Sequence, residues 1–270
     1  MWPKNASKSH IITFTAVTLL ASWGIAYLVA NNANQIGILG MVMVIPTITA
    51  ISLNIIHHRS IFNIYQPVVT GTTRKSLVFA VLYPIAFAAL TGVIALLTGK
   101  AEINSGSLPL PTDYLLHLVG IVLFMVMAFG EEYGWRGFLL PALSEHYGKL
   151  TAALLVGAVW ALYHAPGSYV TAAQLGAANP WLYTLVQMLL LIARSLPLAY
   201  CYFQTKGSII GVILFRAVWD IAHGLVLGQT AGEARTILTG SYFLTGVISW
   251  ELVLSLAAAV WFAIKLKKEA

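Results

Sequence analysis

Long apolar segments alternate with short polar or Gly/Pro-containing connections along the whole of this 270-residue chain. Eight such segments can be marked, approximately over residues 10–30, 36–57, 76–98, 114–142, 150–166, 181–204, 207–228 and 242–265. Each is close to the roughly 20 residues that a helix needs to cross the hydrocarbon core of a bilayer. The pattern predicts an all-α, polytopic membrane bundle of about eight transmembrane helices, folded as a single domain over residues 1–270.

Composition supports a membrane protein and excludes a soluble globular domain. Hydrophobic residues make up 59% of the chain and charged residues only 9%, whereas soluble domains carry about 25% charged residues. The first apolar segment is longer than the roughly 7–15 residues of a signal-peptide core, so we expect a retained span. The one cysteine, Cys201, excludes an intrachain disulfide and a cysteine-rich metal site.

The basic residues predict an orientation in the membrane. With a cytoplasmic N-terminus, ten fall on the inside: Lys4, Lys8, Arg59, Arg74, Lys75, Lys149, Lys206, Lys265, Lys267 and Lys268. Only Lys100 and Arg235 fall outside. This asymmetry follows the positive-inside rule and predicts that both termini are cytoplasmic. It also accounts for the net charge of +6 without any nucleic-acid partner.

Several ionisable residues remain inside the predicted spans, where they are costly unless paired and normally mark function. They are Glu131, Glu132, Arg136, His164, Arg194, Arg216, Asp220, His223 and, near a helix end, Glu251. Counted along helices entering from the predicted cytoplasmic side, Glu131 lies roughly 18 Å deep, His164 roughly 21 Å and Asp220 roughly 20 Å. The similar depths predict one shared polar cluster.

Helical spacing indicates which of these groups can pair. Glu132 and Arg136 are four positions apart and share a face, while Glu131 points about 100° away. One glutamate can therefore neutralise the arginine while the other stays available to a cavity. The alternative is that these groups only hold helices together, but a single ion pair would suffice for that role. Gly130, Gly134 and Gly137 would allow a neighbouring backbone or a substrate to approach closely.

The seventh segment carries a second stripe of polar groups. Arg216 and Asp220 are again four residues apart, and His223 lies nearly on the same stripe. Spacing alone leaves three other polar residues without a defined role: Arg194, for which no partner is evident, His117, nearer the outer surface, and Glu251.

Three ordered elements, EEYGWR at 131–136, WALYH at 160–164 and RAVWD at 216–220, resemble the CPBP family of intramembrane proteases. That family includes type II CAAX prenyl endopeptidases and the bacterial Abi proteins of bacteriocin processing and immunity. Its Glu-Glu-x-x-x-Arg motif is complete here, and its aromatic-x-x-x-His motif is present as Trp160 and His164. The resemblance covers roughly residues 115–228. It departs at the third motif, where Arg216 and Asp220 stand in place of the usual His and Asn.

The resemblance implies hydrolysis of a peptide bond within the membrane of a prokaryotic cell, in a membrane-associated or prenylated substrate. Glu131 would act as general base on a water, aided by His164. Glu132 and Arg136 would hold the helix geometry. Arg216, oriented by Asp220, would stabilise the oxyanion.

Other chemistries and functions stay open from sequence. No cofactor is required by this mechanism, although carboxylates and imidazoles suit zinc or another divalent ion, and Asp220 with His223 has helical spacing compatible with chelation. Because Arg216 replaces the usual histidine, a non-catalytic protein of bacteriocin self-immunity or scaffolding is the main rival. A proton-coupled transporter is a third interpretation, since buried carboxylates also relay protons.

Overall fold

A computed structural model describes residues 6–31, 33–58, 66–69, 71–106, 108–174, 176–205, 207–227, 236–239 and 250–268. The long helices are α1 (Lys8–Ala30), α4 (Arg74–Leu97), α5 (Pro111–Gly134), α7 (Lys149–Gln174), α8 (Pro180–Phe203), α9 (Ile210–Leu227) and α10 (Trp250–Lys268). Shorter helical elements are the 3₁₀ helix η1 (Ala33–Val44), α2 (Ile45–His58), α3 (Gln66–Val69), the π-helix η2 (Trp135–Leu139) and α6 (Leu140–Tyr147). The strands β1 (Glu102–Ile103) and β2 (Leu238–Thr239) form an antiparallel pair in the connections.

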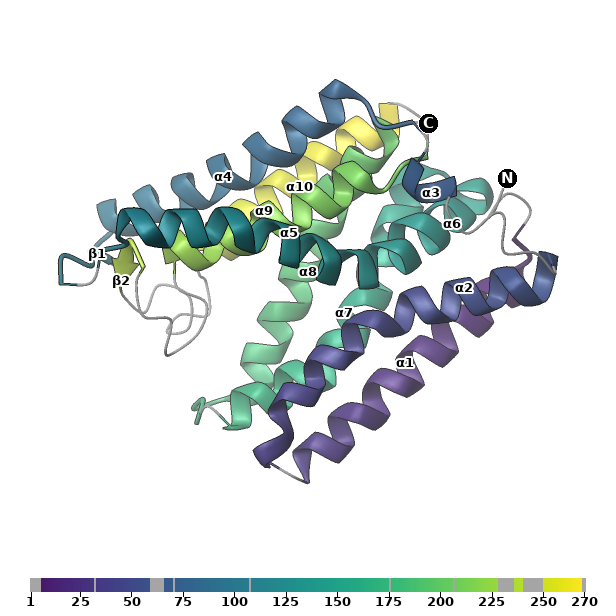
Figure 1. The fold of residues 1–270 in the computed structure, drawn as a ribbon, viewed down its shortest axis with the longest axis horizontal. Coiled ribbons are helices and arrows are strands. Elements are labelled where there is room, and N and C mark those ends of the chain that lie inside the picture. The colour runs from purple at the N-terminus through teal and green to yellow at the C-terminus, as the bar shows by residue number, and fades with distance from the viewer. Residues whose placement is uncertain are drawn as a thin grey trace.

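The prediction of an integral, multi-pass helical protein is confirmed. Within the residues that the structure describes, six helical stretches are long and apolar enough to cross a membrane: Lys8–Ala30, Ile38–His57, Arg74–Leu97, Pro111–Tyr147, Lys149–Gln174 and Pro180–Phe203. Helices α9 and α10 coincide with the seventh and eighth predicted segments and lie beside α4 (Figure 1). The positive-inside orientation stays a prediction. Four of its residues, Lys4, Arg59, Lys206 and Arg235, and the predicted start of the eighth segment at 242–249 lie outside the described residues.

Two predicted boundaries are wrong. The fourth span does not end at residue 142, because α5, η2 and α6 follow one another without a break to Tyr147. The fifth does not end at Pro166, since α7 continues through this proline to Gln174. Proline is tolerated inside membrane helices where neighbouring groups take up the freed backbone.

Local sequence signals define several helix ends. The Ser7 side chain accepts the His10 backbone N–H at the start of α1, and Thr73 does the same for Ser76 at the start of α4. Asn179 accepts the Leu182 N–H at the start of α8, so each of these helices has a polar N-cap.

The helices form two groups joined by α7 and α8 (Figure 1). One group contains α1, η1 and α2, and α1 packs against α7. The other contains α4, α5, α9 and α10, with α4 and α5 both packed on α9. Between α1 and α7, Ser22 Oγ donates to the Tyr163 carbonyl at 2.7 Å. Such interhelical hydrogen bonds help hold membrane helices in register.

Close backbone packing sets α5 against the η1–α2 segment. A Cβ atom built at Gly130 would lie 2.8 Å from the Met43 carbonyl oxygen, and one at Gly134 would lie 2.4 Å from Pro46 Cβ. These contacts confirm the close approach predicted for two of the three glycines. At Gly137 the nearest atom lies at an ordinary 3.5 Å.

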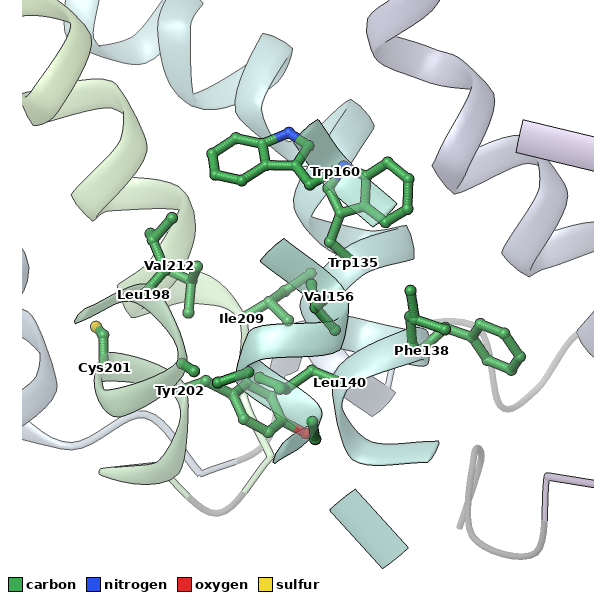
Figure 2. Packing of buried hydrophobic residues seen from close by; sticks show 14 of the residues in the cluster. Trp135, Phe138, Leu140, Val156, Trp160, Leu198, Cys201, Tyr202, Ile209 and Val212 are labelled. Atoms are coloured by element: carbon green, nitrogen blue, oxygen red, sulfur yellow. The ribbon is translucent and has the colours of Figure 1, made fainter. Parts of the chain in front are cut away.

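A continuous apolar core surrounds the point where α5, α7, α8 and α9 meet. Figure 2 shows part of it, including Trp135, Trp160, Leu198, Cys201 and Ile209, all fully buried. Cys201 is a free thiol within this core. The core holds the segment from Trp135 to Leu140 between the other helices and so determines where the adjacent glutamates point.

The glycine contacts generate a stability prediction. We expect Gly134→Ala to destabilise the protein by about 1–3 kcal/mol, because the added methyl group overlaps the Pro46 backbone. Gly137→Ala is the matched control, since both changes raise helix propensity but only one meets a clash. Thermal unfolding in detergent measures the difference, and equal melting temperatures for the two variants would contradict the packing.

Candidate active site

Glu131 lies at the centre of the predicted cluster and is almost fully buried. Its Oε2 atom accepts hydrogen bonds from the indole N–H groups of Trp160 at 2.8 Å and Trp135 at 3.2 Å. The His164 Nε2 atom lies 3.4 Å from the same oxygen, which confirms the predicted meeting of α5 and α7. Glu131 Oε1 has no hydrogen-bond partner within the described part of the chain. One carboxylate oxygen is thus held in place while the other is left without a donor.

Glu132 has a different environment from its neighbour. Arg136 Nη1 donates to both oxygens of Glu132, at 2.9 Å each, and both side chains are inaccessible. Arg136 Nη2 also donates to Ser195 Oγ at 3.4 Å, and Ser195 donates to the Ala153 carbonyl at 2.9 Å. The ion pair predicted from the spacing is present, and a hydrogen-bond chain fixes it to α8 and α7.

The arginine of this pair lies within the π-helix η2. A π-turn widens the helix by one residue and often occurs at functional sites. Trp135 and Arg136 therefore leave the regular α-helical path at the position where they bond to Glu131 and Glu132. The sequence spacing predicted the second contact correctly, because a separation of four residues still brings the two side chains together.

Arg216 enters the cluster from α9 and lies between three carboxylates. Its Nη1 atom is 3.8 Å from Glu131 Oε2 and 3.7 Å from Glu132 Oε1, and its Nε atom is 3.9 Å from Asp220 Oδ2. All three distances exceed those of hydrogen bonds. Within the described residues, Nε and Nη1 have no hydrogen-bond partner. Arg216 thus contributes positive charge and retains N–H donors for a further acceptor.

Trp160 links the two arginines as well as binding Glu131. The guanidinium carbons of Arg136 and Arg216 lie 4.8 Å and 4.7 Å from the centre of its ring. Cation–π attraction of this kind is strongest over tryptophan and gains from exclusion of water. Trp160, the aromatic residue of the aromatic-x-x-x-His motif, therefore donates a hydrogen bond to Glu131 and packs against both guanidinium groups. The sequence marked this position but did not reveal these roles.

His164 contacts the buried Glu131 carboxylate and also lines a cavity. Its side chain is 30% exposed, against 1% for Glu131. It lines a cavity of about 260 Å³, whose polar walls also contain Ser22, Ser168, Thr171, Tyr183 and Gln187. A volume of this size accommodates several waters at about 30 Å³ each, and the polar groups offer them partners. The imidazole is thus placed between a polar cavity and Glu131.

The structure gives partners to Arg194 and His223, the latter having been an alternative source of an imidazole for the site because it lies on the stripe of Arg216 and Asp220. Arg194 does have a partner, because its Nη2 atom lies 3.5 Å from Glu251 Oε1 and its guanidinium packs 4.3 Å from the Trp219 ring centre. His223 does not supply an imidazole to Glu131. Its Nε2 atom lies 3.6 Å from Glu251 Oε1, and its Nδ1 atom bonds to the Trp219 carbonyl. Arg194, Trp219, His223 and Glu251 thus form a second cluster. Its contacts join helices that are distant in sequence, so residue spacing could not reveal them.

His117 is also separate from the candidate active site in its contacts. Its Nδ1 atom bonds to the backbone carbonyl of Asp113, one turn earlier on α5. His117 lies near the start of α5, and its placement towards the outer surface stays a prediction, as the orientation does.

The donor groups at the site do not fit a divalent metal. Among the side chains that the structure describes, no three His, Cys, Asp or Glu residues come together as a metal-binding group. Both Glu132 oxygens are bonded to Arg136, and Arg216 lies 3.8 Å from Glu131. Catalytic zinc takes three protein ligands, whereas in the described part of the chain Glu131 and His164 meet without a third His, Cys, Asp or Glu to complete such a group. The i, i+3 chelate of Asp220 and His223 is not formed either, since His223 contacts Glu251.

Comparison with known proteins identifies relatives of the segment that carries the site. Residues 113–222 match the family model of type II CAAX prenyl endopeptidase Rce1-like proteins. A curated protein of Methanococcus maripaludis, "CAAX prenyl protease 2", is 27% identical over 143 residues, which cover 52% of this chain and 51% of that protein. The match therefore spans about half the length of each protein. The range of the family model, residues 113–222, contains Glu131, Glu132, Arg136, His164, Arg216 and Asp220.

The buried ion pair predicts a large effect on stability. We expect Glu132→Gln to cost about 3–5 kcal/mol, because it leaves the inaccessible Arg136 guanidinium without a counter-charge. Asp220→Asn should cost less, since this carboxylate is 25% exposed and 3.9 Å from its guanidinium. Unfolding in detergent compares the two, and a greater loss for the Asp220 variant would contradict the assignment.

Proposed function

Because residues 113–222 match the family model of type II CAAX prenyl endopeptidase Rce1-like proteins, we propose that the protein is an intramembrane endopeptidase using a glutamate-activated water. The single observation that carries the proposal is that a carboxylate and a guanidinium lie next to each other, each with an atom that lacks a hydrogen-bond partner. Among the described residues, Glu131 Oε1 has no donor and Arg216 Nη1 has no acceptor, and this guanidinium nitrogen lies 3.8 Å from the other oxygen of Glu131.

In the proposed reaction, water enters through the polar cavity beside His164 and meets the free oxygen of Glu131. Glu131 accepts one proton as the water oxygen attacks the carbonyl carbon of the scissile peptide bond. His164, next to the same carboxylate, helps to orient the water. The indole N–H groups of Trp135 and Trp160 fix the carboxylate and leave Oε1 to act as base.

The tetrahedral intermediate carries a negative oxygen that requires donors in a low-dielectric site. Arg216 has free Nε and Nη1 donors for it, and Asp220 orients the guanidinium from one turn away. The carbon–nitrogen bond then breaks, and the proton held by Glu131 passes to the departing amine. The products are a new carboxylate and a free amine, and Glu131 returns to its starting state.

Neighbouring apolar space supports a membrane-associated substrate. A groove of about 700 Å³ between α1, α7 and α8 has apolar and aromatic walls that include Trp23, Tyr27, Tyr169 and Trp181. Ala26 lines both this groove and the polar cavity at His164. A peptide with a lipid-like or prenyl anchor could therefore place its anchor in the groove and its polar backbone beside His164.

The first functional test removes the proposed base. We expect Glu131→Gln to lower cleavage of candidate membrane-anchored peptides by about 10²–10⁴-fold, the usual contribution of a general base. Purified protein in detergent and a mass-spectrometric assay of the products measure this. Undiminished cleavage would exclude the mechanism. Cellular function that survives both Glu131→Gln and His164→Ala would instead favour the non-catalytic alternative.

A second test separates the tryptophan hydrogen bond from its packing. Trp160→Phe retains an aromatic ring beneath the two guanidinium groups but removes the N–H that holds Glu131 Oε2. We expect kcat to fall by about tenfold or more, because a hydrogen bond to a charged group contributes about 1.5–3 kcal/mol. The melting temperature of the same variant serves as the control, and an unchanged kcat would contradict the orienting role.

Metal removal provides a third test. Since the donor set does not fit a divalent ion, we expect prolonged incubation with a strong chelator to leave cleavage unchanged. The assay should include a known zinc protease, which must lose activity under the same conditions. Loss of cleavage that returns on adding zinc would overturn the metal-free mechanism while leaving the endopeptidase assignment intact.

A further inference from the structure

A second groove, separate from the candidate active site, lies between α4 and α8 and has a volume of about 680 Å³. Its α4 wall begins at Arg74 and Lys75 and continues through Val78 and Leu82 to Ala86. Ala86 lies twelve positions after Arg74, which corresponds to a rise of roughly 18 Å along the helix. This is close to half of the roughly 30 Å hydrocarbon core. The groove therefore reaches from one membrane surface to near the middle.

The charged groups of the groove are confined to the end that lies at the membrane surface. Arg74 and Lys75 are the first residues of α4, a helix long and apolar enough to span the membrane, and both are exposed. No acidic residue lines the groove, and neither cation forms an ion pair within the described residues. Two uncompensated cations thus lie where lipid headgroups begin, above an apolar channel one leaflet deep.

We propose that the α4–α8 groove binds one anionic phospholipid, with its phosphate at Arg74 and Lys75 and an acyl chain along Val78, Leu82 and Ala86. The length of the groove matches a single leaflet, and its charge is complementary to an anionic headgroup. An apolar transmembrane helix would cover the apolar part but would offer no charge for the two cations. A soluble anion would satisfy the cations but leave the apolar channel empty.

The floor of the groove connects it to the proposed catalytic helix. Phe79 and Tyr83 pack against Phe215 of α9, at 5.9 Å and 5.6 Å between ring centres. Tyr83 also stacks on Trp219 at 6.4 Å. Phe215 and Trp219 are the residues immediately before Arg216 and Asp220 in the chain. A lipid in the groove would therefore contact Phe79 and Tyr83, which pack against the aromatic residues of α9.

Lipid binding can be measured without any substrate. The full-length protein is reconstituted in phosphatidylcholine vesicles with or without phosphatidylglycerol, and lipid retained after extraction is counted by native mass spectrometry. We expect the wild type to retain one phosphatidylglycerol. Retention should be about 30-fold weaker in the double variant R74Q/K75Q, since each basic residue near the surface contributes to anionic-lipid attraction.

The matched control removes two charges from the same end of the molecule. K267Q/K268Q alters the exposed end of α10, which lies beside the start of α4 (Figure 1) but does not line the groove. It should retain lipid like the wild type. Equal loss in both double variants, equal retention of phosphatidylcholine, complete displacement by inorganic phosphate, or a second copy of the chain in place of lipid would each overturn the proposal.

A second pair of variants tests the apolar channel with the cations intact. Ala86→Trp should fill the deep end of the groove and weaken retention, whereas Ile85→Trp, on an exposed neighbour outside the groove, should not. Equal retention in these two variants would contradict acyl-chain binding in the groove.

The link to α9 rests on the proposed function and has its own readout. Cleavage in vesicles should rise with phosphatidylglycerol in the wild type and in K267Q/K268Q but not in R74Q/K75Q. Retention without this activation would remove the coupling but keep the lipid site, and absence of cleavage in every sample would count only against the endopeptidase.

Discussion

The arrangement of this protein depends on compensating charge inside a membrane. Glu131, Glu132 and Asp220 contribute three carboxylates to one small region, and Arg136 and Arg216 provide two guanidinium groups among them. An unpaired ion at this depth costs several kcal/mol, so the helices must approach until each charge has a partner. The close backbone contacts of α5 and the hydrogen bonds of Ser195 hold the helices at this short separation. The catalytic arrangement that we propose is built from the same contacts.

Two adjacent glutamates have opposite environments because they lie on different faces of one helix. Glu132 is bonded through both oxygens to Arg136 and is inaccessible. Glu131 is held by indole and imidazole groups on one oxygen only. One carboxylate therefore stabilises the structure, and the other retains capacity for chemistry. The same pair of residue types can divide the two tasks only because a helix separates neighbours by about 100°.

Helix α9 contacts both polar clusters and the aromatic residues of α4. On one side, Arg216 meets the glutamates, and on another, His223 contacts Glu251 beside Arg194. Its aromatic residues pack against α4, where the proposed lipid groove lies. Arg216 thus lies on the same helix as the aromatic residues that contact α4. The proposed influence of lipid on the proposed reaction rests on these contacts.

The sequence alone was sufficient for the membrane class, the approximate spans, the Glu132–Arg136 pair and the convergence of Glu131, His164 and Arg216. These features follow from local rules: hydrophobic length, helical spacing and the depth of a residue along its span. The resemblance to intramembrane proteases added the expected order of the motifs, and the family comparison agrees with it.

Only the tertiary structure decided which helices supply the remaining partners. Arg194 meets Glu251 across 57 positions of sequence, and Trp160 donates to Glu131 across 29. Neither contact can be read from periodicity, because helix packing depends on small residues and core shape that bring distant segments together. The opening of the polar cavity at His164, and the absence of a third metal ligand among the described residues, were decided in the same way. The sequence determined which groups the membrane requires to be paired, and the packing of the helices selected the partners.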